Sequence, residues 1–254
     1  MTTSDILYER ERRFHAAVRA ALAERAPTGQ IGTLGEKLLH ATLKHYAEPD
    51  PACHEQILGR HHADAVNGSR ISEVQTANFN RLRPRLEAWL SDYTVDILYP
   101  VAAVKYLRWI DPDTGETGPA RRSPKRGQPG DIAIELTRIR AWLGDERVRI
   151  RILLLELEEY RLRDGYSRDG KRGSHRYERI PLSLIDEVVL HAPGDYLQLL
   201  PPLEQETFTS ADVARAARRS QSKASLILRL LRELGQLEVI GKNGNSLIHR
   251  HTQL

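Results

Sequence analysis

The sequence predicts an α/β fold in which helices flank a mixed central sheet, followed by a small C-terminal helical module. Three observations indicate this: apolar residues recur at helical spacing up to Tyr46, strand-like runs begin at His54, and the pattern restarts after Pro202. We therefore expect an α/β core with an N-terminal helix over residues 1–200 and a separate module over residues 201–254.

The composition is that of a globular protein without disulfide bonds. Of the 254 residues, 40% are hydrophobic and 28% are charged, which excludes wholesale disorder. Cys53 is the single cysteine, which excludes a disulfide framework and a cysteine-based zinc site and suits a reducing cytoplasm. The polar, charged N-terminus predicts neither a signal peptide nor a membrane partner. The net charge is only +4, so the placement of the basic residues matters more than their number.

Helical and strand-like patterns alternate along the core. Residues 4–26 and 34–46 are expected to be helices, the second with Thr33 and Glu36 at capping-box spacing. Asn67-Gly68 is the strongest turn signal and predicts a hairpin. The further elements expected are a helix over 82–90, strands over 95–101 and 104–109, a glycine- and proline-rich loop over 111–130, a helix over 132–143, a long strand over 148–162 and its return strand over 177–182.

Two carboxylates on the predicted hairpin suggest a metal site. If Asn67-Gly68 forms a two-residue loop, the strand pairing puts four polar side chains on one face of the sheet. These are His62, Asp64, Glu73 and Gln75. Neighbouring carboxylates repel each other unless a hard cation such as Mg²⁺ lies between them. Such a cation can activate water and stabilise charge on a phosphate.

The order of a helix with Glu36, then Asp64, then Glu73-Val74-Gln75 on a hairpin resembles the PD-(D/E)xK nuclease superfamily over residues 30–160. The resemblance implies a restriction-endonuclease-like core. It also implies that Asp64, Glu73 and the Val74 carbonyl bind Mg²⁺ or Mn²⁺, and that Glu36 adds a metal or water contact. Two departures stand out: His62-Ala63 replaces the proline that often precedes the aspartate, and Gln75 replaces the lysine that activates water. Gln75 is then expected to position water as a neutral amide.

Plainer interpretations stay open for the same residues. Glu36 fits the capping box with Thr33 whether or not it has a catalytic role. Asp64 and Glu73 also fit solvated strand positions. His61 and His62 are more typical of a polar surface than of metal ligands.

The C-terminal pattern resembles a winged helix-turn-helix over residues 208–250. Helices are expected over 211–218 and 223–234, followed by short strands over 237–240 and 246–249. From Pro202 to Leu254 there are eight Lys or Arg against five Asp or Glu, which suits a phosphate-facing surface. The DNA-binding candidates are Gln221, Lys223, Arg229 and Arg232 on the second helix, Lys242 in the wing, and Arg121, Arg122, Lys125 and Arg126 in the basic loop. A module used for protein contact is the alternative.

The leading functional hypothesis is a Mg²⁺- or Mn²⁺-dependent DNA endonuclease that holds duplex DNA with its C-terminal module. A second hypothesis is a catalytically inactive DNA-binding regulator with a nuclease-like fold. A third is a protein-interaction scaffold. The layout also resembles an uncharacterised bacterial family that joins such a core to a winged helix, and a homodimer is a possible assembly.

Overall fold

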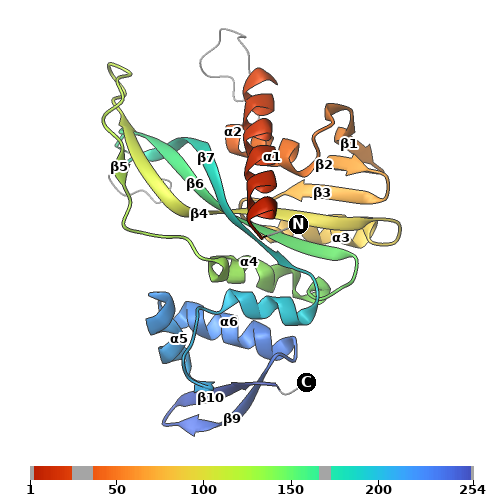
Figure 1. Ribbon diagram of the computed structural model, residues 1–254, viewed down its shortest axis with the longest axis vertical. Helices are drawn as coiled ribbons and strands as arrows, with labels where there is room; N and C mark the ends of the chain where they lie inside the picture. The colour runs from red at the N-terminus through yellow and green to blue at the C-terminus, as the bar shows by residue number, and fades with distance from the viewer. Residues whose placement is uncertain (1–2, 25–36, 166–172, 253–254) are drawn as a thin grey trace.

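The computed structural model describes residues 3–24, 37–165 and 173–252, and it contains a mixed sheet of seven strands (Figure 1). The order across the sheet is β1-β2-β3-β4-β6-β7, with β5 paired to β4. Strand β4 runs parallel to both β3 and β6, and the other pairs are antiparallel. The strands are β1 (His54–Leu58), β2 (His61–Asn67), β3 (Arg70–Val74), β4 (Thr94–Ile110), β5 (Arg121–Arg122), β6 (Val148–Leu162) and β7 (His175–Leu190). The α/β fold class with a mixed central sheet is thus confirmed.

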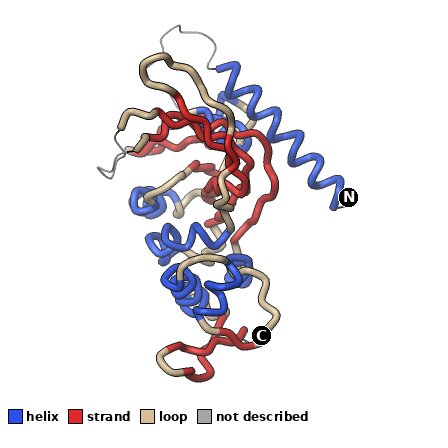
Figure 2. Tube along the Cα trace, turned by 90° about the vertical axis from the view of Figure 1, so that its left-hand side faces the viewer, coloured by secondary structure: helices blue, strands red, loops and turns tan. Residues whose placement is uncertain are grey.

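Helices cover both faces of the sheet. On one face, α1 (Thr3–Glu24) and α2 (Leu38–Ala47) pack through Phe14 and Leu43 against sheet residues such as Leu153. The tube in Figure 2 shows α1 lying outside the strands on that side. The opposite face is covered by α3 (Arg83–Trp89), α4 (Ala133–Leu136) and the 3-10 helices η2 (Phe79–Leu82), η3 (Pro129–Ile132), η4 (Thr137–Trp142) and η5 (Pro193–Leu199). A further 3-10 helix, η1 (Pro51–Cys53), precedes β1.

The C-terminal module comprises β8 (Thr207–Phe208), α5 (Ser210–Ala217), α6 (Gln221–Glu233), β9 (Leu237–Asn243) and β10 (Ser246–His251). The three strands pair in the order β8-β10-β9. The expected order of helix, turn, helix and hairpin is confirmed, and Thr209 caps α5 by accepting the Asp212 N–H. Strand β8 was not predicted, because two residues carry no periodicity.

The C-terminal module and the sheet share one hydrophobic core. Ile227 of α6 belongs to the same buried cluster as Ile132, Leu136 and Leu199 of the α/β core. A Cβ added at Gly130 would lie 2.7 Å from Ile227 Cδ1, so the Ile227 side chain packs directly against the glycine backbone. The module is therefore held against the rest of the chain by packed apolar side chains.

Three predictions about the elements were wrong. The two strands expected over 95–101 and 104–109 form one strand, β4, with a register shift between Ala102 and Val104. The helix expected over 132–143 is broken into short pieces, because Ile139 has non-helical dihedrals. Part of the loop expected over 111–130 is strand, since β5 pairs with β4.

The hairpin register was also wrong, by two residues. Asn67 pairs with Arg70 and Ala65 with Ser72, so the two-residue loop is Gly68-Ser69 rather than Asn67-Gly68. Gly68 adopts a φ of 57°, which the loop requires and which glycine adopts without a steric penalty. A shift of two residues leaves every side chain on the face of the sheet where it was expected. Asp64 and Glu73 therefore still lie on the same face.

Candidate carboxylate pair and basic groove

Asp64 and Glu73 meet at the end of the β2–β3 hairpin. Asp64 Oδ2 accepts the Val74 N–H at 2.6 Å, and the Asp64 N–H lies 3.4 Å from Glu73 Oε2. The Asp64 side chain therefore binds the backbone where the β2–β3 pairing ends, beyond Ala65 and Ser72. Each carboxylate thus contacts the backbone of the strand that carries the other, and the metal-binding role predicted for the two stays a prediction. Val74 contacts Asp64 through its N–H; the predicted role of its carbonyl as a metal ligand stays a prediction.

Side chains from two helices contact this pair. Arg85 of α3 donates to Glu73 Oε1, and Glu73 is almost fully buried. His40 of α2 places Nε2 3.4 Å from Asp64 Oδ2. A buried carboxylate requires such a partner, because its desolvation is otherwise uncompensated. Arg85 therefore compensates the charge of Glu73, and Asp64 has the His40 imidazole as a neighbour.

The fit to Mg²⁺ follows from those contacts. Two carboxylates are the donors that Mg²⁺ prefers. However, both oxygens of Glu73 and one oxygen of Asp64 are engaged by Arg85, His40 and backbone N–H groups. The pair as it stands does not fit the ion, and Arg85 would have to leave Glu73 first.

No hydrogen bond joins Gln75, the other described residue predicted for this site, to Asp64 or Glu73. Gln75 donates its N–H to Leu98 O at 2.9 Å, and its side-chain amide lies 3.5 Å from Asn78 O, away from Asp64 and Glu73. Glu36 lies outside the described residues. The structure thus brings together two of the four predicted catalytic residues.

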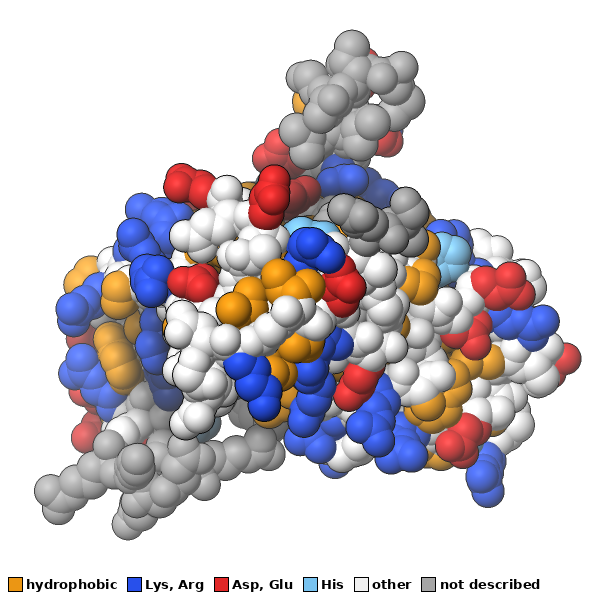
Figure 3. Space-filling model, turned by 90° about the horizontal axis from the view of Figure 1, so that it is seen from below, with side chains coloured by type: hydrophobic (Ala, Val, Ile, Leu, Met, Phe, Trp, Pro, Cys, Tyr) orange, Lys and Arg blue, Asp and Glu red, His pale blue; other side chains and the backbone are white. Residues whose placement is uncertain are grey.

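A basic groove runs between the sheet and the C-terminal module. Its volume is about 570 Å³, and its walls come from the middle of β4, the loop before η3, and the turn between α5 and α6. The lining includes one acidic residue, Asp131, against six basic ones: Lys105, Lys125, Arg126, Arg218, Arg219 and Lys223. Figure 3 shows the molecule from below, where Lys and Arg side chains gather along the left and lower centre of the face.

Half of the basic side chains in the groove have no acidic partner. Lys105 pairs with Glu159 at 3.3 Å, and Arg219 and Lys223 both pair with Asp131. Within the part of the chain that the structure describes, no ion pair involves the other three: Lys125, Arg126 and Arg218. These three side chains are exposed, so the groove presents uncompensated positive charge to solvent.

The backbone at Arg218 is unusual. Arg218 ends α5 with a φ of 51°, in the left-handed region that glycine usually occupies at helix ends. Asp131 is the counterpart across the groove: Arg219 Nε and Nη2 each donate to its carboxylate at 2.8 Å. The turn between α5 and α6 is therefore fixed to the α/β core by a bidentate pair.

The positive field extends onto the long strands. Glu159 of β6 is buried among Lys105, Arg161 and Arg176. Burial and the neighbouring charge of Arg176 lower the pKa of Arg179 to about 10. A guanidinium with so depressed a pKa experiences an excess of positive charge and little solvent.

The predicted DNA-binding residues divide into two groups. Most are exposed: Arg121, Arg122, Lys125, Arg126, Gln221, Lys223, Arg229 and Lys242. Arg232 is the exception, because it is half-buried and its Nε has no hydrogen-bond partner. Arg232 is therefore less accessible than the other candidates on α6, where Leu228 and Leu231 are buried.

Sequence reasoning missed Lys105, Arg218 and Arg219. The adjacent arginines in the turn between two predicted helices were a usable signal, because clustered basic residues favour contact with phosphate. Lys105 gave no signal, since a single lysine in a strand is normally a solvated residue.

The carboxylate pair and the groove are joined through β4. Val74 of β3 pairs with Leu98 of β4, and the next residue, Tyr99, lines the groove. Tyr99 also packs edge-on against Phe79 at 5.6 Å between ring centroids. The hairpin end and the groove therefore lie on adjacent strands of one sheet.

Comparison with known proteins places the core of this chain in a family. Residues 37–191, more than half of the chain, match the profile described as a domain of unknown function, DUF8091. The chain belongs to the DUF8091 family. The DUF8091 segment runs from the start of α2 to the end of β7, so it includes the carboxylate pair and the β4 side of the groove but not the C-terminal module.

A relative extends beyond the DUF8091 segment. An uncharacterized protein of Treponema pallidum (strain Nichols) is 28% identical over 221 residues, covering 87% of each chain. No solved structure matches the chain. Among the described helices, none has the length and hydropathy that crossing a membrane requires.

Proposed function

We propose that this protein binds duplex DNA, with phosphates in the basic groove and the C-terminal module acting as a winged helix. The observation that carries the proposal is the groove lining of six Lys or Arg against one acidic residue. Phosphate contacts by such side chains release counterions and supply most of the affinity for DNA. The cytoplasm is the compartment that suits this function.

The start of α6 supports the same proposal. Ser220 is the N-cap of this 13-residue helix, and its side chain makes no capping hydrogen bond. Ser220 and Lys223 both line the groove, so the positive end of the helix dipole lies beside the basic side chains. The exposed residues Ser222, Ser225 and Arg229 follow at helical spacing and extend this surface along α6.

The test is the salt dependence of DNA binding by the full chain. We expect the affinity for a duplex oligonucleotide to fall steeply with salt, and the triple variant Lys125→Ala, Arg126→Ala, Arg218→Ala to bind less tightly. If each side chain neutralises one phosphate, the slope of log K against log salt decreases by about 3 in the variant. Arg12→Ala is the control. It removes an exposed arginine of α1 that does not line the groove, so it should leave the slope unchanged.

Two results would contradict this function. One is the absence of measurable DNA binding at about 50 mM salt, which would favour a protein-interaction scaffold. The other is equal binding by wild type and triple variant.

The homodimer is a separate prediction, and light scattering of the full chain checks it.

A second candidate is metal-dependent cleavage of DNA, which the proximity of Asp64 and Glu73 favours. A bound Mg²⁺ would activate water and stabilise phosphate charge. The pairing of Glu73 with Arg85 opposes this candidate and favours the inactive regulator. Arg85 therefore decides between the two functions.

Arg85→Met provides that decision. If Mg²⁺ or Mn²⁺ competes with Arg85 for Glu73, the variant binds the ion more tightly than wild type, while Glu73→Gln abolishes binding. Cleavage of duplex, branched or single-stranded DNA by wild type, lost in Asp64→Ala, would establish the nuclease. No cleavage by either protein and no metal binding by Arg85→Met would leave the DNA-binding regulator.

A further inference from the structure

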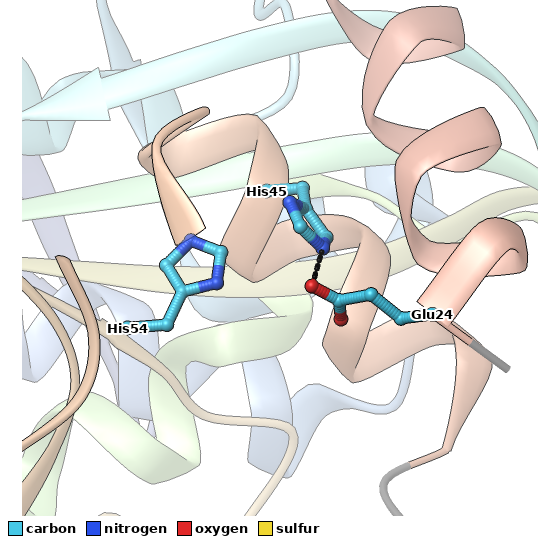
Figure 4. A group of neighbouring side chains, drawn as sticks. All are labelled: Glu24, His45 and His54. Carbon is cyan, nitrogen blue, oxygen red and sulfur yellow. Dashed lines mark ion pairs between the residues drawn. The ribbon is translucent and has the colours of Figure 1, made fainter. Parts of the chain in front are cut away.

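Three potential metal ligands from distant parts of the sequence meet beside the sheet. Glu24 is the last residue of α1, His45 lies near the end of α2, and His54 begins β1. One ligand atom from each lies within 4.8 Å of the other two. Figure 4 shows the three side chains turned toward a common point. Neither the carboxylate pair nor the basic groove contains any of these residues.

His45 is buried and has no hydrogen-bond partner for its ring nitrogens. Its side chain is 2% exposed, and neither ring nitrogen has a hydrogen-bond partner. Nε2 lies 3.0 Å from Glu24 Oε1, which is ion-pair distance, although the geometry does not satisfy a hydrogen bond. A buried imidazole without hydrogen bonds is costly, because its polar atoms have lost water without replacement. The deficit disappears if His45 binds an ion.

His54 is oriented as metal-binding histidines usually are. Its Nε2 lies 2.8 Å from the Glu48 carbonyl oxygen, and because a carbonyl only accepts, Nε2 carries the proton. That tautomer leaves the lone pair on Nδ1, the ring nitrogen that faces Glu24 and His45 in Figure 4. A hydrogen bond from the far ring nitrogen to a backbone carbonyl fixes the ligand and raises its basicity.

We propose that Glu24, His45 and His54 form a binding site for Zn²⁺. Two imidazole nitrogens and one carboxylate oxygen are ligands that zinc accepts, and three protein ligands leave a fourth position for water. Mg²⁺ is disfavoured, because it prefers oxygen ligands. The three ligand atoms lie within 4.8 Å of one another, so a bound ion would link α1, α2 and β1 directly.

The experiment uses zinc itself and the full chain. Zn²⁺ is titrated against a chromophoric chelator at about pH 7.5. We expect one tight site in wild type, and binding weakened by about tenfold or more in Glu24→Gln and in His54→Gln. His45 is left intact, since replacing so buried a residue endangers folding. Circular dichroism confirms that each variant is folded.

Matched controls come from the same helix. His15 lies 3.6 Å from Glu11 in an exposed pair on α1, so His15→Gln and Glu11→Gln remove the same residue types from a place without a third ligand. Both controls should bind zinc as wild type does. Asp64→Asn should also leave zinc binding intact, which separates this site from the carboxylate pair.

Thermal unfolding gives a second readout. Because zinc binds three elements of the folded chain, free Zn²⁺ at about one hundred times Kd should raise Tm by roughly 5–10 °C in wild type and not in His54→Gln. The proposal is overturned if wild type has no zinc site tighter than about 10 µM, or if the ligand variants bind zinc as tightly as the controls. The proposal also fails if Glu24→Gln lowers Tm while zinc changes the Tm of neither wild type nor variant, because Glu24 and His45 would then form only an ion pair.

Discussion

Arg219 donates two hydrogen bonds of 2.8 Å to the carboxylate of Asp131, which joins the turn between α5 and α6 to the 3-10 helix η3. Burial acts to raise the pKa of Asp131, but the hydrogen bonds from Arg219 and from the Gln128 backbone lower it below its usual value. Lys223 adds a third cationic contact at 3.2 Å. One carboxylate thus holds two of the cations that line the groove.

Asp131→Asn should lower stability and strengthen DNA binding. The free energy of unfolding should fall by about 1–3 kcal/mol, since Asp131 is only partly shielded from solvent. Affinity for duplex DNA should rise, because a negative charge leaves the groove and Arg219 and Lys223 become available to phosphate. Urea unfolding and fluorescence anisotropy measure the two effects, and Asp113→Asn in an exposed loop is the control. Weaker DNA binding by Asp131→Asn would contradict the groove as the binding surface.

Gly127→Ala should disturb the wall of the groove. A Cβ at this position would lie 2.5 Å from Val101 Cγ1 and 2.6 Å from the Ala102 carbonyl oxygen, so the loop must move away from β4. We expect a loss of about 1–3 kcal/mol in unfolding free energy and weaker DNA binding. Gly118→Ala, whose Cβ would meet only Trp109 O at 3.8 Å, should behave as wild type in both measurements.

Glu187→Gln should reduce the sensitivity of the fold to acid. Burial acts to raise the pKa of Glu187, but the charge and hydrogen bond of Arg151 lower it below its usual value of 4.5. A carboxyl with a depressed pKa in the folded state stabilises the protein above pH 4.5, and this contribution is lost as the pH falls through the folded-state pKa. Unfolding free energies at about pH 6 and about pH 3 should therefore differ less in the variant than in wild type. An equal difference in both proteins would contradict the shift, and Glu87→Gln on the exposed side of α3 is the control.

Tyr46→Phe should destabilise the packing of α2 on the sheet. The Tyr46 hydroxyl donates to Glu187 at 2.7 Å, and the side chain is buried. Loss of this charged hydrogen bond should lower the free energy of unfolding by about 1–2 kcal/mol. Tyr8→Phe, at an exposed position of α1, should have no effect in the same urea titration.

Elements with strong local patterns could be predicted from the sequence. The bounds of β6, Val148–Leu162, are those that its apolar run predicts, and α5 and α6 lie within one or two residues of the expected helices. The kink at Ile139 could not be predicted, because Ile132, Leu136 and Ile139 fit one face of a continuous helix equally well.

The hairpin register was decided by contacts outside the hairpin. Both two-residue loops, Asn67-Gly68 and Gly68-Ser69, contain the glycine that a tight turn requires. In the structure, Asn67 remains in the strand and its amide donates to Glu48 Oε2 at 2.8 Å. Glu48 follows α2 and is 19 residues away in sequence, so no local signal distinguishes the two registers.

Only part of the candidate sites could be predicted. The proximity of Asp64 and Glu73 follows from the alternation of side chains along paired strands. Their partners, Arg85 and His40, come from helices on either side of the hairpin in sequence, and only the folded chain brings them to the carboxylates. The groove and the cluster of Glu24, His45 and His54 could not be predicted either. Each is formed by segments that are distant in sequence and share no motif.

The left-handed backbone of Arg218 has a cost in fold stability, which under the proposed function is opposed by a contribution of its side chain to DNA affinity. A side chain in this conformation costs roughly 1 kcal/mol relative to glycine. Arg218→Gly should therefore yield a protein that withstands more heat yet holds phosphate less tightly. A laboratory selection for heat resistance would favour this replacement, whereas a selection for retention on DNA would remove it.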